Sequence, residues 1–226
     1  PPPTINDIIA AEIKDDPFYD ELQKYASQTN LKNFLEIGSS SGGGSTDAFV
    51  SAIRARSDKD SVQLFCMELS KPRFELLSKT YEGDAFVKAY NVSSISAAEF
   101  PPEAEIINFY NTQQTNLNHH KLETIIGWYH QDLAYLKDNQ SNISGIAHIK
   151  SKNNIGLFDM VLIDGSEFTG ERELAYVIGA KVIALDDTQT FKCFNAMKAL
   201  EKDSNYRLVT YRPDVRNGYA IFEKVN

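Results

Sequence analysis

Three aspartates follow two short apolar runs in the second half of the chain. Asp164 comes directly after the run Met160–Ile163, and Asp186 and Asp187 come directly after Val182–Leu185. Such runs are typical of buried strands, and neighbouring parallel strands lie about 4.8 Å apart, so we expect the three carboxylates at one edge of a sheet. Carboxylates this close repel one another unless protons or a cation neutralise them. The residues predict a site for Mg²⁺, Mn²⁺ or Ca²⁺; the alternative is that Asp187 caps the next helix while another carboxylate is solvated.

A loop of small residues follows the apolar run Phe34–Ile37, which contains Glu36. The loop residues that could contact a ligand are Gly38, Ser39, Ser40, Gly42, Gly44, Ser45 and Thr46. Glycines let the backbone approach a ligand, and free N–H groups at the start of the helix expected over Asp47–Arg56 attract negative charge. Glu36 suits a positive charge beside that anion, so an α-amino carboxylate fits both. The spacing does not match the G-x-G-x-x-G pattern of dinucleotide sites; the alternative is a tight connection between strand and helix.

Two further polar residues follow expected strands. Glu68 comes directly after Val62–Met67, and a carboxylate at such a strand tip accepts both hydroxyls of a ribose. The alternative is a solvated carboxylate at the start of the next helix. Asn91 follows the expected strand Phe86–Tyr90, where a contact to an adenine ring would lie. With the small-residue loop, these positions predict a ligand that carries a nucleoside.

Strand-type and helix-type periodicities alternate along most of the chain. Strands are expected over Phe34–Ile37, Val62–Met67, Phe86–Tyr90, Asp159–Ile163, Lys181–Leu185, Tyr206–Tyr211 and Tyr219–Glu223. Helices are expected between them over Asp47–Arg56, Lys71–Tyr81, Glu171–Val177 and Thr190–Lys202. The alternation predicts a single α/β domain over residues 1–226, with a doubly wound, mostly parallel seven-stranded sheet. The last two strands are close in sequence and predict an antiparallel edge.

N-terminal helices are expected within residues 1–30. The first would place isoleucines at helical spacing, namely Ile5, Ile8, Ile9 and Ile13. The second would begin at Pro17, because proline is favoured at the first position of a helix and Asp16 can serve as its N-cap.

An insertion is expected over residues 93–154, where no clear strand–helix unit occurs. An amphipathic helix near Lys121–Lys137 is its main predicted element. The insertion would hang over the carboxyl ends of the strands, where ligands bind in such sheets, and we expect it to cover a substrate. It would also bring His119 to the site as a base. The alternatives are a dimerisation arm or surface decoration for the insertion, and a solvated loop histidine for His119.

Charge and composition limit the partners. The 226-residue chain has a formal net charge of −8, which argues against nucleic acid as the main partner because phosphate binding draws on Lys and Arg. No apolar run approaches the roughly 20 residues of a membrane span, and the start at Pro1 lacks the basic and apolar segments of a signal peptide. Cys66 and Cys193 are expected to be free, as in a reducing compartment. We therefore expect a cytoplasmic protein without a membrane partner.

The segment E-I-G-S-S-S-G, residues 36–42, resembles the first motif of class I S-adenosylmethionine-dependent methyltransferases. The resemblance implies that Glu36 holds the amino group of the methionine part and that the glycine loop wraps its carboxylate. A second resemblance involves D-M-V-L-I-D-G-S-E-F, residues 159–168, and V-I-A-L-D-D, residues 182–187. Both segments are similar to the metal-dependent O-methyltransferases related to catechol O-methyltransferase and to the branch that includes cephalosporin hydroxylases.

This resemblance implies roles for the acidic residues. Asp164, Asp186 and Asp187 fall on the metal-ligand positions, with Mg²⁺ or Mn²⁺ as the ion, and S-adenosyl-L-methionine is the implied cofactor, which Asp164 would also contact. Glu167 stands where one branch has His and another has Lys, so its carboxylate is expected to act as general base or as a further metal ligand. The implied reaction is methylation of a hydroxyl on a small molecule or sugar. The alternatives are a metal-using nucleotide-sugar transferase and a non-catalytic nucleotide-binding module, and a homo-oligomer is compatible with each.

Overall fold

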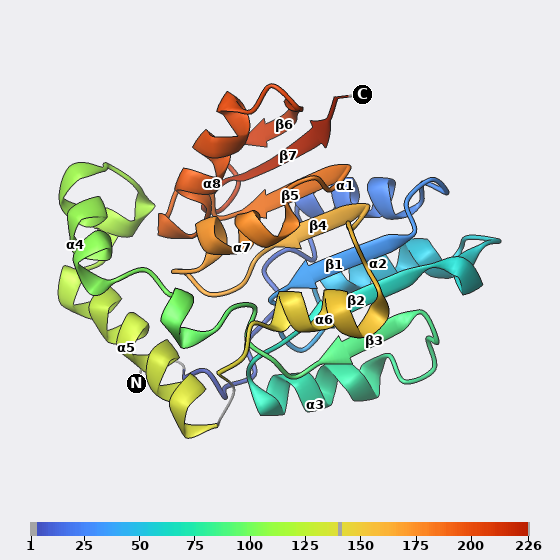
Figure 1. Ribbon diagram of the computed structural model, residues 1–226, viewed down its shortest axis with the longest axis horizontal. Helices are drawn as coiled ribbons and strands as arrows, with labels where there is room; N and C mark the ends of the chain where they lie inside the picture. The colour runs from blue at the N-terminus through green and yellow to red at the C-terminus, as the bar shows by residue number, and fades with distance from the viewer. Residues whose placement is uncertain (1–3, 140–141, 226) are drawn as a thin grey trace.

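A seven-stranded sheet forms the centre of the computed structural model, which describes residues 4–139 and 142–225. The opening prolines, on which part of the signal-peptide argument depends, lie outside the described residues. The strand order is β3-β2-β1-β4-β5-β7-β6 (Figure 1). The bounds are β1 (Asn33–Ile37), β2 (Gln63–Met67), β3 (Val87–Tyr90), β4 (Met160–Ile163), β5 (Val182–Asp186), β6 (Tyr206–Arg212) and β7 (Tyr219–Lys224). β1 to β5 pair in parallel, and β7 is antiparallel to both of its neighbours. The predicted sheet and its antiparallel edge are confirmed.

The strand order reverses at β1, because the strands before the insertion continue the sheet on one side of it and the later strands on the other. β1 pairs with β2 on one side and with β4 on the other, and Ile37 lies in register with Met67 and Ile163. The loops after these three strands therefore start at the same level. Such a point in a doubly wound sheet leaves a crevice between the loops, where ligands bind.

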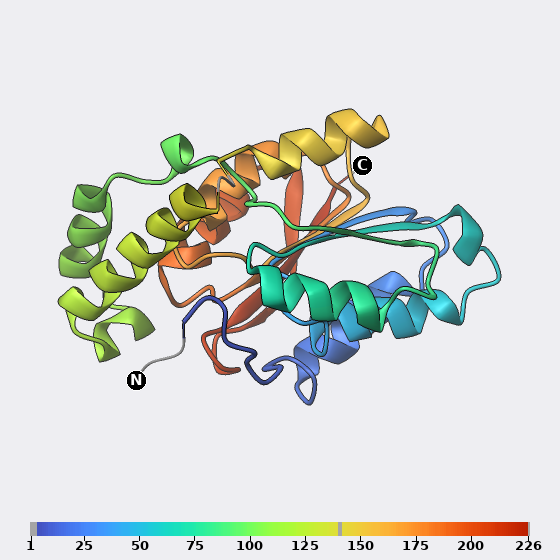
Figure 2. The same cartoon turned by 90° about the horizontal axis from the view of Figure 1, so that it is seen from below.

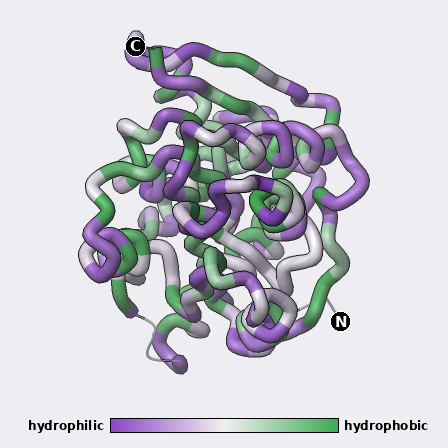
Figure 3. The backbone as a smooth tube through the Cα atoms, turned by 90° about the vertical axis from the view of Figure 1, so that its right-hand side faces the viewer, coloured by the Kyte–Doolittle hydropathy of each residue, from purple (hydrophilic) through white to green (hydrophobic). Residues whose placement is uncertain are grey.

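Helices cover both faces of the sheet (Figure 2). One face packs against α1 (Pro17–Ala26), α2 (Ser45–Arg54) and α3 (Lys71–Thr80), and the other packs against α6 (Gly145–Asn153), α7 (Gly170–Val177) and α8 (Phe191–Lys202). Hydrophobic and hydrophilic residues alternate along the helices, as one buried side per helix requires (Figure 3). A short 3₁₀ turn, η1 (Lys59–Ser61), precedes β2. No helix in the described ranges is long and apolar enough to cross a membrane.

The N-terminal segment contains one of the two expected helices. α1 begins at Pro17, and the Asp16 side chain accepts a hydrogen bond from the backbone N–H of Phe18, as predicted. Residues 4–16 form turns and extended chain, so the helix expected from Ile5 to Ile13 is wrong. Of its four isoleucines Ile13 alone is buried, and a short helix without a buried face is not stable in water.

The insertion projects beyond the carboxyl ends of the strands (Figures 1 and 2). It contains η2 (Ala97–Glu99), α4 (Glu103–Thr112), η3 (Asn116–His119) and α5 (Leu122–Asp138). The predicted helix near Lys121–Lys137 is thus confirmed as α5. Helix α6 covers the sheet, with Ile146 and Ile149 fully buried in the core. The projecting part is therefore shorter than the predicted 93–154.

An aromatic cluster fastens the insertion to the domain. Phe109 of α4 packs edge-on against Phe191 of α8, with ring centroids 5.0 Å apart, and Tyr129 of α5 packs against Phe168 at 5.4 Å. These four side chains are buried. Burying one such ring contributes about 1.5–3 kcal/mol, so α4 and α5 are docked on the loop that follows β4 and on the start of α8.

Candidate functional site

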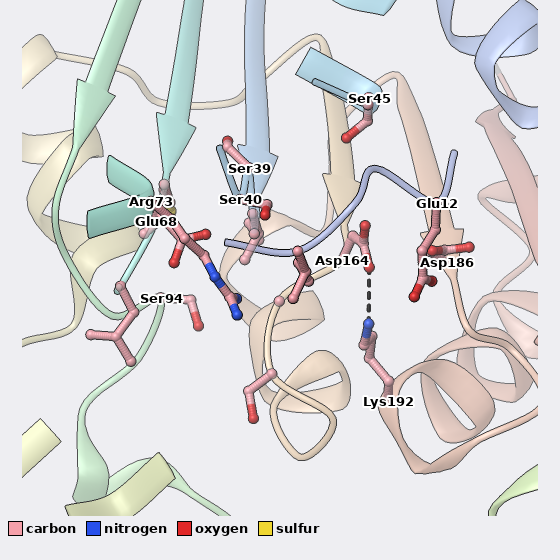
Figure 4. A pocket seen from close by; sticks show the side chains of 18 of the residues that line it. Glu12, Ser39, Ser40, Ser45, Glu68, Arg73, Ser94, Asp164, Asp186 and Lys192 are labelled. Atoms are coloured by element: carbon pink, nitrogen blue, oxygen red, sulfur yellow. Dashed lines mark hydrogen bonds and ion pairs between the residues drawn. The ribbon is translucent and has the colours of Figure 1, made fainter. Parts of the chain in front are cut away.

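A cavity of about 430 Å³ lies at the carboxyl ends of the parallel strands (Figure 4). Glu68 and Arg73 lie toward one end, and Asp164, Asp186 and Lys192 lie toward the other. The small-residue loop after β1 lies between the two ends. The sequence-predicted residues that line the cavity are Gly38, Ser39, Ser40, Gly44, Ser45, Glu68, Asp164, Asp186 and Asp187.

The N-terminal segment crosses the cavity (Figure 4). Ile9, Glu12 and Ile13 contribute to its lining. Arg73 holds this segment, because its Nε donates a hydrogen bond to the main-chain oxygen of Asp7 at 2.7 Å. The residues expected to form a first helix thus form a strap over the candidate site.

Two glycines of the loop are required by close packing. Gly38 has φ +86°, and a Cβ added there would lie 2.0 Å from the main-chain oxygen of Asp164. Gly42 has φ +88°, and its added Cβ would lie 2.7 Å from the ring of Tyr81. The sequence predicts that Gly38 lets the backbone approach a ligand. In the structure it lets the backbone approach the end of the neighbouring strand β4. Gly42 does not line the cavity.

Glu36 is fully buried and does not line the cavity. Its carboxylate accepts hydrogen bonds from the hydroxyls of Ser39 at 2.6 Å, Ser45 at 2.5 Å and Thr46 at 2.7 Å. The implied contact of Glu36 with a ligand amino group is replaced here by contacts to the loop itself. Thr46 is also absent from the lining, so Glu36 and Thr46 shape the loop from behind.

Glu68 is placed as the sequence predicts, at the tip of β2 and against the cavity. One carboxylate oxygen accepts a hydrogen bond from the backbone N–H of Ser70 at 2.7 Å. Burial raises the pKa of Glu68. Asn91 does not line the cavity; its Nδ2 donates to the main-chain oxygens of Glu68 and Leu69, both at 2.8 Å. Asn91 thus fixes the turn that carries Glu68.

The three predicted aspartates come together. Asp164, Asp186 and Asp187 each offer a carboxylate oxygen, and these oxygens lie within 4.8 Å of one another. Asp187 has φ +54°, a conformation that short polar side chains tolerate best. Burial raises the pKa of Asp164 well above its usual range and that of Asp186 to about 6. The number and chemistry of these donors suit a divalent ion.

Two side-chain cations already pair with these aspartates. Lys192 Nζ lies 2.9 Å from Asp164 and 2.6 Å from Asp187. Arg216 Nη1 donates to both carboxylate oxygens of Asp186, at 2.8 and 3.0 Å. Since both cations neutralise the charge that a metal would otherwise meet, the residues as placed do not fit a resident divalent ion.

Glu167 is half-buried and does not line the cavity. It accepts a hydrogen bond from the backbone N–H of Lys192 at 3.2 Å, so it supports the first turn of α8. Burial raises its pKa to about 7. His119 is exposed on η3 and does not line the cavity either. Neither residue expected to act as a base has its side chain against the cavity.

Asp132 of α5 is a cavity carboxylate that the sequence argument did not single out. It accepts a hydrogen bond from the hydroxyl of Ser166, in the loop after β4. Burial raises its pKa to about 6. A signal was present, because Asp132 lies three residues after Tyr129 and four before Leu136, on the apolar side of the amphipathic helix.

Comparison with solved structures supports the fold assignment. The O-methyltransferase from Bacillus cereus in complex with S-adenosylhomocysteine has a TM-score of 0.54 at 12% identity, over 96% of this chain and 84% of that one. The methyltransferase from Podospora anserina with S-adenosylhomocysteine bound has 0.52 at 14%, over 95% and 81%. A methyltransferase from Geobacter sulfurreducens has 0.52 at 12%, over 94% and 82%. The chain has a Rossmann-like methyltransferase fold. No family model and no curated protein matches the sequence.

Proposed function

We propose that the protein is an S-adenosylmethionine-dependent methyltransferase that acts on a hydroxyl of a small molecule or sugar. The supporting observation is the cavity itself, which runs from the carboxylate of Glu68, past the small-residue loop, to the group formed by Asp164, Lys192 and Asp132. It lies at the point of the sheet where this class of fold binds its ligands. The likeness to structures that contain S-adenosylhomocysteine is consistent with this use.

The cofactor would lie along the loop between Gly38 and Ser45. Ser39 and Ser45 face the cavity, and the backbone N–H groups at the start of α2 suit the methionine carboxylate. Glu68 would accept the ribose hydroxyls. Glu36 would act indirectly, by holding the serine and threonine hydroxyls of the loop in place.

S-adenosylmethionine supplies a methyl group on a positively charged sulfur. The protein has to align the acceptor oxygen with that carbon and accept the hydroxyl proton. Asp132 is suited to the second task, because its carboxylate lines the cavity and its pKa of about 6 leaves it ionised at neutral pH. Ser166 fixes the orientation of Asp132 through its hydroxyl.

The acceptor side of the cavity combines apolar and polar contacts. Phe100 and Asp132, both from the insertion, face the cavity together with Ser94. A ring or carbon chain would pack on Phe100, and hydroxyl groups would donate to the carboxylate of Asp132. This pairing favours a small polar acceptor over a macromolecule, because the insertion restricts access from that side.

Calorimetry with S-adenosylhomocysteine tests the cofactor assignment. We expect binding to the wild type and a loss of about 1–3 kcal/mol in Glu68→Ala, because the ribose hydroxyls lose a charged acceptor. Glu75→Ala is the matched control, since Glu75 is exposed on the neighbouring helix α3. UDP-glucose serves as the competing ligand. Binding of UDP-glucose without binding of S-adenosylhomocysteine would replace this proposal with the nucleotide-sugar alternative.

A further inference from the structure

Lys192 bridges two of the aspartates predicted to hold a metal. Asp164 follows β4 and Asp187 follows β5, and the ammonium lies within 3 Å of a carboxylate oxygen of each, at 2.9 and 2.6 Å. The Lys192 side chain is 9% exposed. A buried ammonium in this position supplies positive charge to both strand ends, which is what a divalent ion bound there would supply.

Asp186, the third aspartate, pairs with Arg216. Arg216 reaches Asp186 from the hairpin between β6 and β7, and its Nε also pairs with Asp16 at 2.5 Å. The guanidinium is thus held between the N-cap of α1 and the end of β5. A divalent ion at this cluster would have to displace Lys192 or lie beside two fixed cations, and like charges repel strongly in a partly buried site.

The ammonium of Lys192 also has one N–H group that donates to neither aspartate. A lysine ammonium carries three N–H donors, and within the described residues the hydrogen bonds of Lys192 Nζ go to Asp164 and Asp187. Lys192 lines the cavity. The remaining N–H is therefore available to an oxygen atom bound in the cavity.

We propose that the ammonium of Lys192 takes the place of the divalent ion and binds the acceptor oxygen, so that methyl transfer proceeds without a metal; this rests on the function proposed above. The acceptor oxygen forms a bond to the methyl carbon, and the carbon–sulfur bond breaks with its electron pair remaining on sulfur. The hydroxyl proton passes to Asp132. Lys192 keeps its proton and stabilises negative charge as it develops on the oxygen.

Mn²⁺ binding, measured by electron paramagnetic resonance, tests the proposal without an acceptor. The wild type should bind no Mn²⁺ at concentrations that saturate Lys192→Met, in which the stem remains and the ammonium is gone. Lys192→Met should bind one ion, and this binding should disappear in Lys192→Met with Asp187→Asn. Lys198→Met is the matched control, because Lys198 is exposed on the same helix, and it should behave like the wild type.

Two results would overturn the proposal: Mn²⁺ binding to the wild type that Asp187→Asn abolishes, or a folded Lys192→Met that binds no Mn²⁺. If Lys192→Met does not fold, Lys192→Arg keeps the positive charge and must also exclude Mn²⁺, whereas binding to it counts against the idea. Calorimetry with S-adenosylhomocysteine in EDTA runs in parallel. Its failure would remove the proposed function, whereas Mn²⁺ binding to the wild type alone would leave that function in place and restore the metal.

Discussion

Gly38, after β1, lies directly against the main-chain oxygen of Asp164, after β4. The Cβ of any other residue at position 38 would lie 2.0 Å from that oxygen, and the φ of +86° is itself unfavourable for a side chain. The small-residue loop and the aspartate cluster are therefore positioned by one backbone contact. A disturbance at Gly38 would therefore reach both the loop and the aspartate end of the cavity.

Gly38→Ala should destabilise the protein by about 2–4 kcal/mol, from the backbone strain and the overlap with Asp164 together. It should also abolish binding of S-adenosylhomocysteine. Urea unfolding and calorimetry measure the two effects. Gly83→Ala is the control, because a Cβ there meets nothing within 4 Å. Equal unfolding midpoints for the two variants would contradict the close contact.

Glu36→Gln should loosen the small-residue loop. The variant replaces a charged acceptor of three hydroxyl hydrogen bonds with a neutral amide, at a cost of about 1–3 kcal/mol. Hydrogen exchange of the backbone amides in residues 38–46 should become faster. The exposed Glu82 provides the control substitution Glu82→Gln. Unchanged exchange in the loop would show that the hydroxyl contacts do not hold it.

The acidic residues at the strand ends could be predicted from the sequence. Each of them ends a short apolar run, and the carboxyl ends of parallel strands lie at the same edge of a sheet. Glu68, Asp164 and Asp186 all lie where that argument places them. The orientation of Glu36 also follows from strand alternation. Leu35 and Ile37 face one helix layer, so Glu36 faces the other layer, where α2 begins with Ser45.

The cations at the aspartates could not be predicted in the same way. Lys192 lies on a helix whose rotation relative to the strands is set by core packing, and Arg216 reaches Asp186 because β7 returns antiparallel beside β5. The position of the insertion on the domain could not be predicted either. The sequence predicts its amphipathic helix, but the docking of Phe109 on Phe191 depends on α8, which is far away in sequence.

The projecting insertion should respond to ligand, whereas α6 should not. Phe100 and Asp132 line the cavity, so bound S-adenosylhomocysteine should reduce the opening motions of residues 97–138 and slow their amide exchange. Residues 145–153 of α6 are an internal control, because that helix is packed on the sheet. Hydrogen exchange followed by mass spectrometry compares the two segments. The same change in both would indicate a global effect, and no change in 97–138 would favour an assembly contact.

Asp132→Asn should make the protein more stable at neutral pH. Burial raises the pKa of Asp132 from 3.8 to about 6, so between about pH 4 and pH 6 the folded state holds a proton that the unfolded state has lost. Stability therefore falls as pH rises through this window, because the folded protein binds more protons there. The asparagine side chain has no such proton, and its oxygen can still accept from Ser166.

Urea unfolding at pH 4 and pH 7 measures this difference. The variant should exceed the wild type by about 1–3 kcal/mol at pH 7, the equivalent of the pKa shift, and the gap should narrow at pH 4. Asp138→Asn, exposed on the same helix, should follow the wild type at both values.

Once an acceptor is identified, Asp132→Asn should also slow turnover by about 10²–10⁴-fold, as expected for loss of a general base. A variant that gains stability and keeps full turnover would confirm the burial of Asp132 and assign the proton to another group.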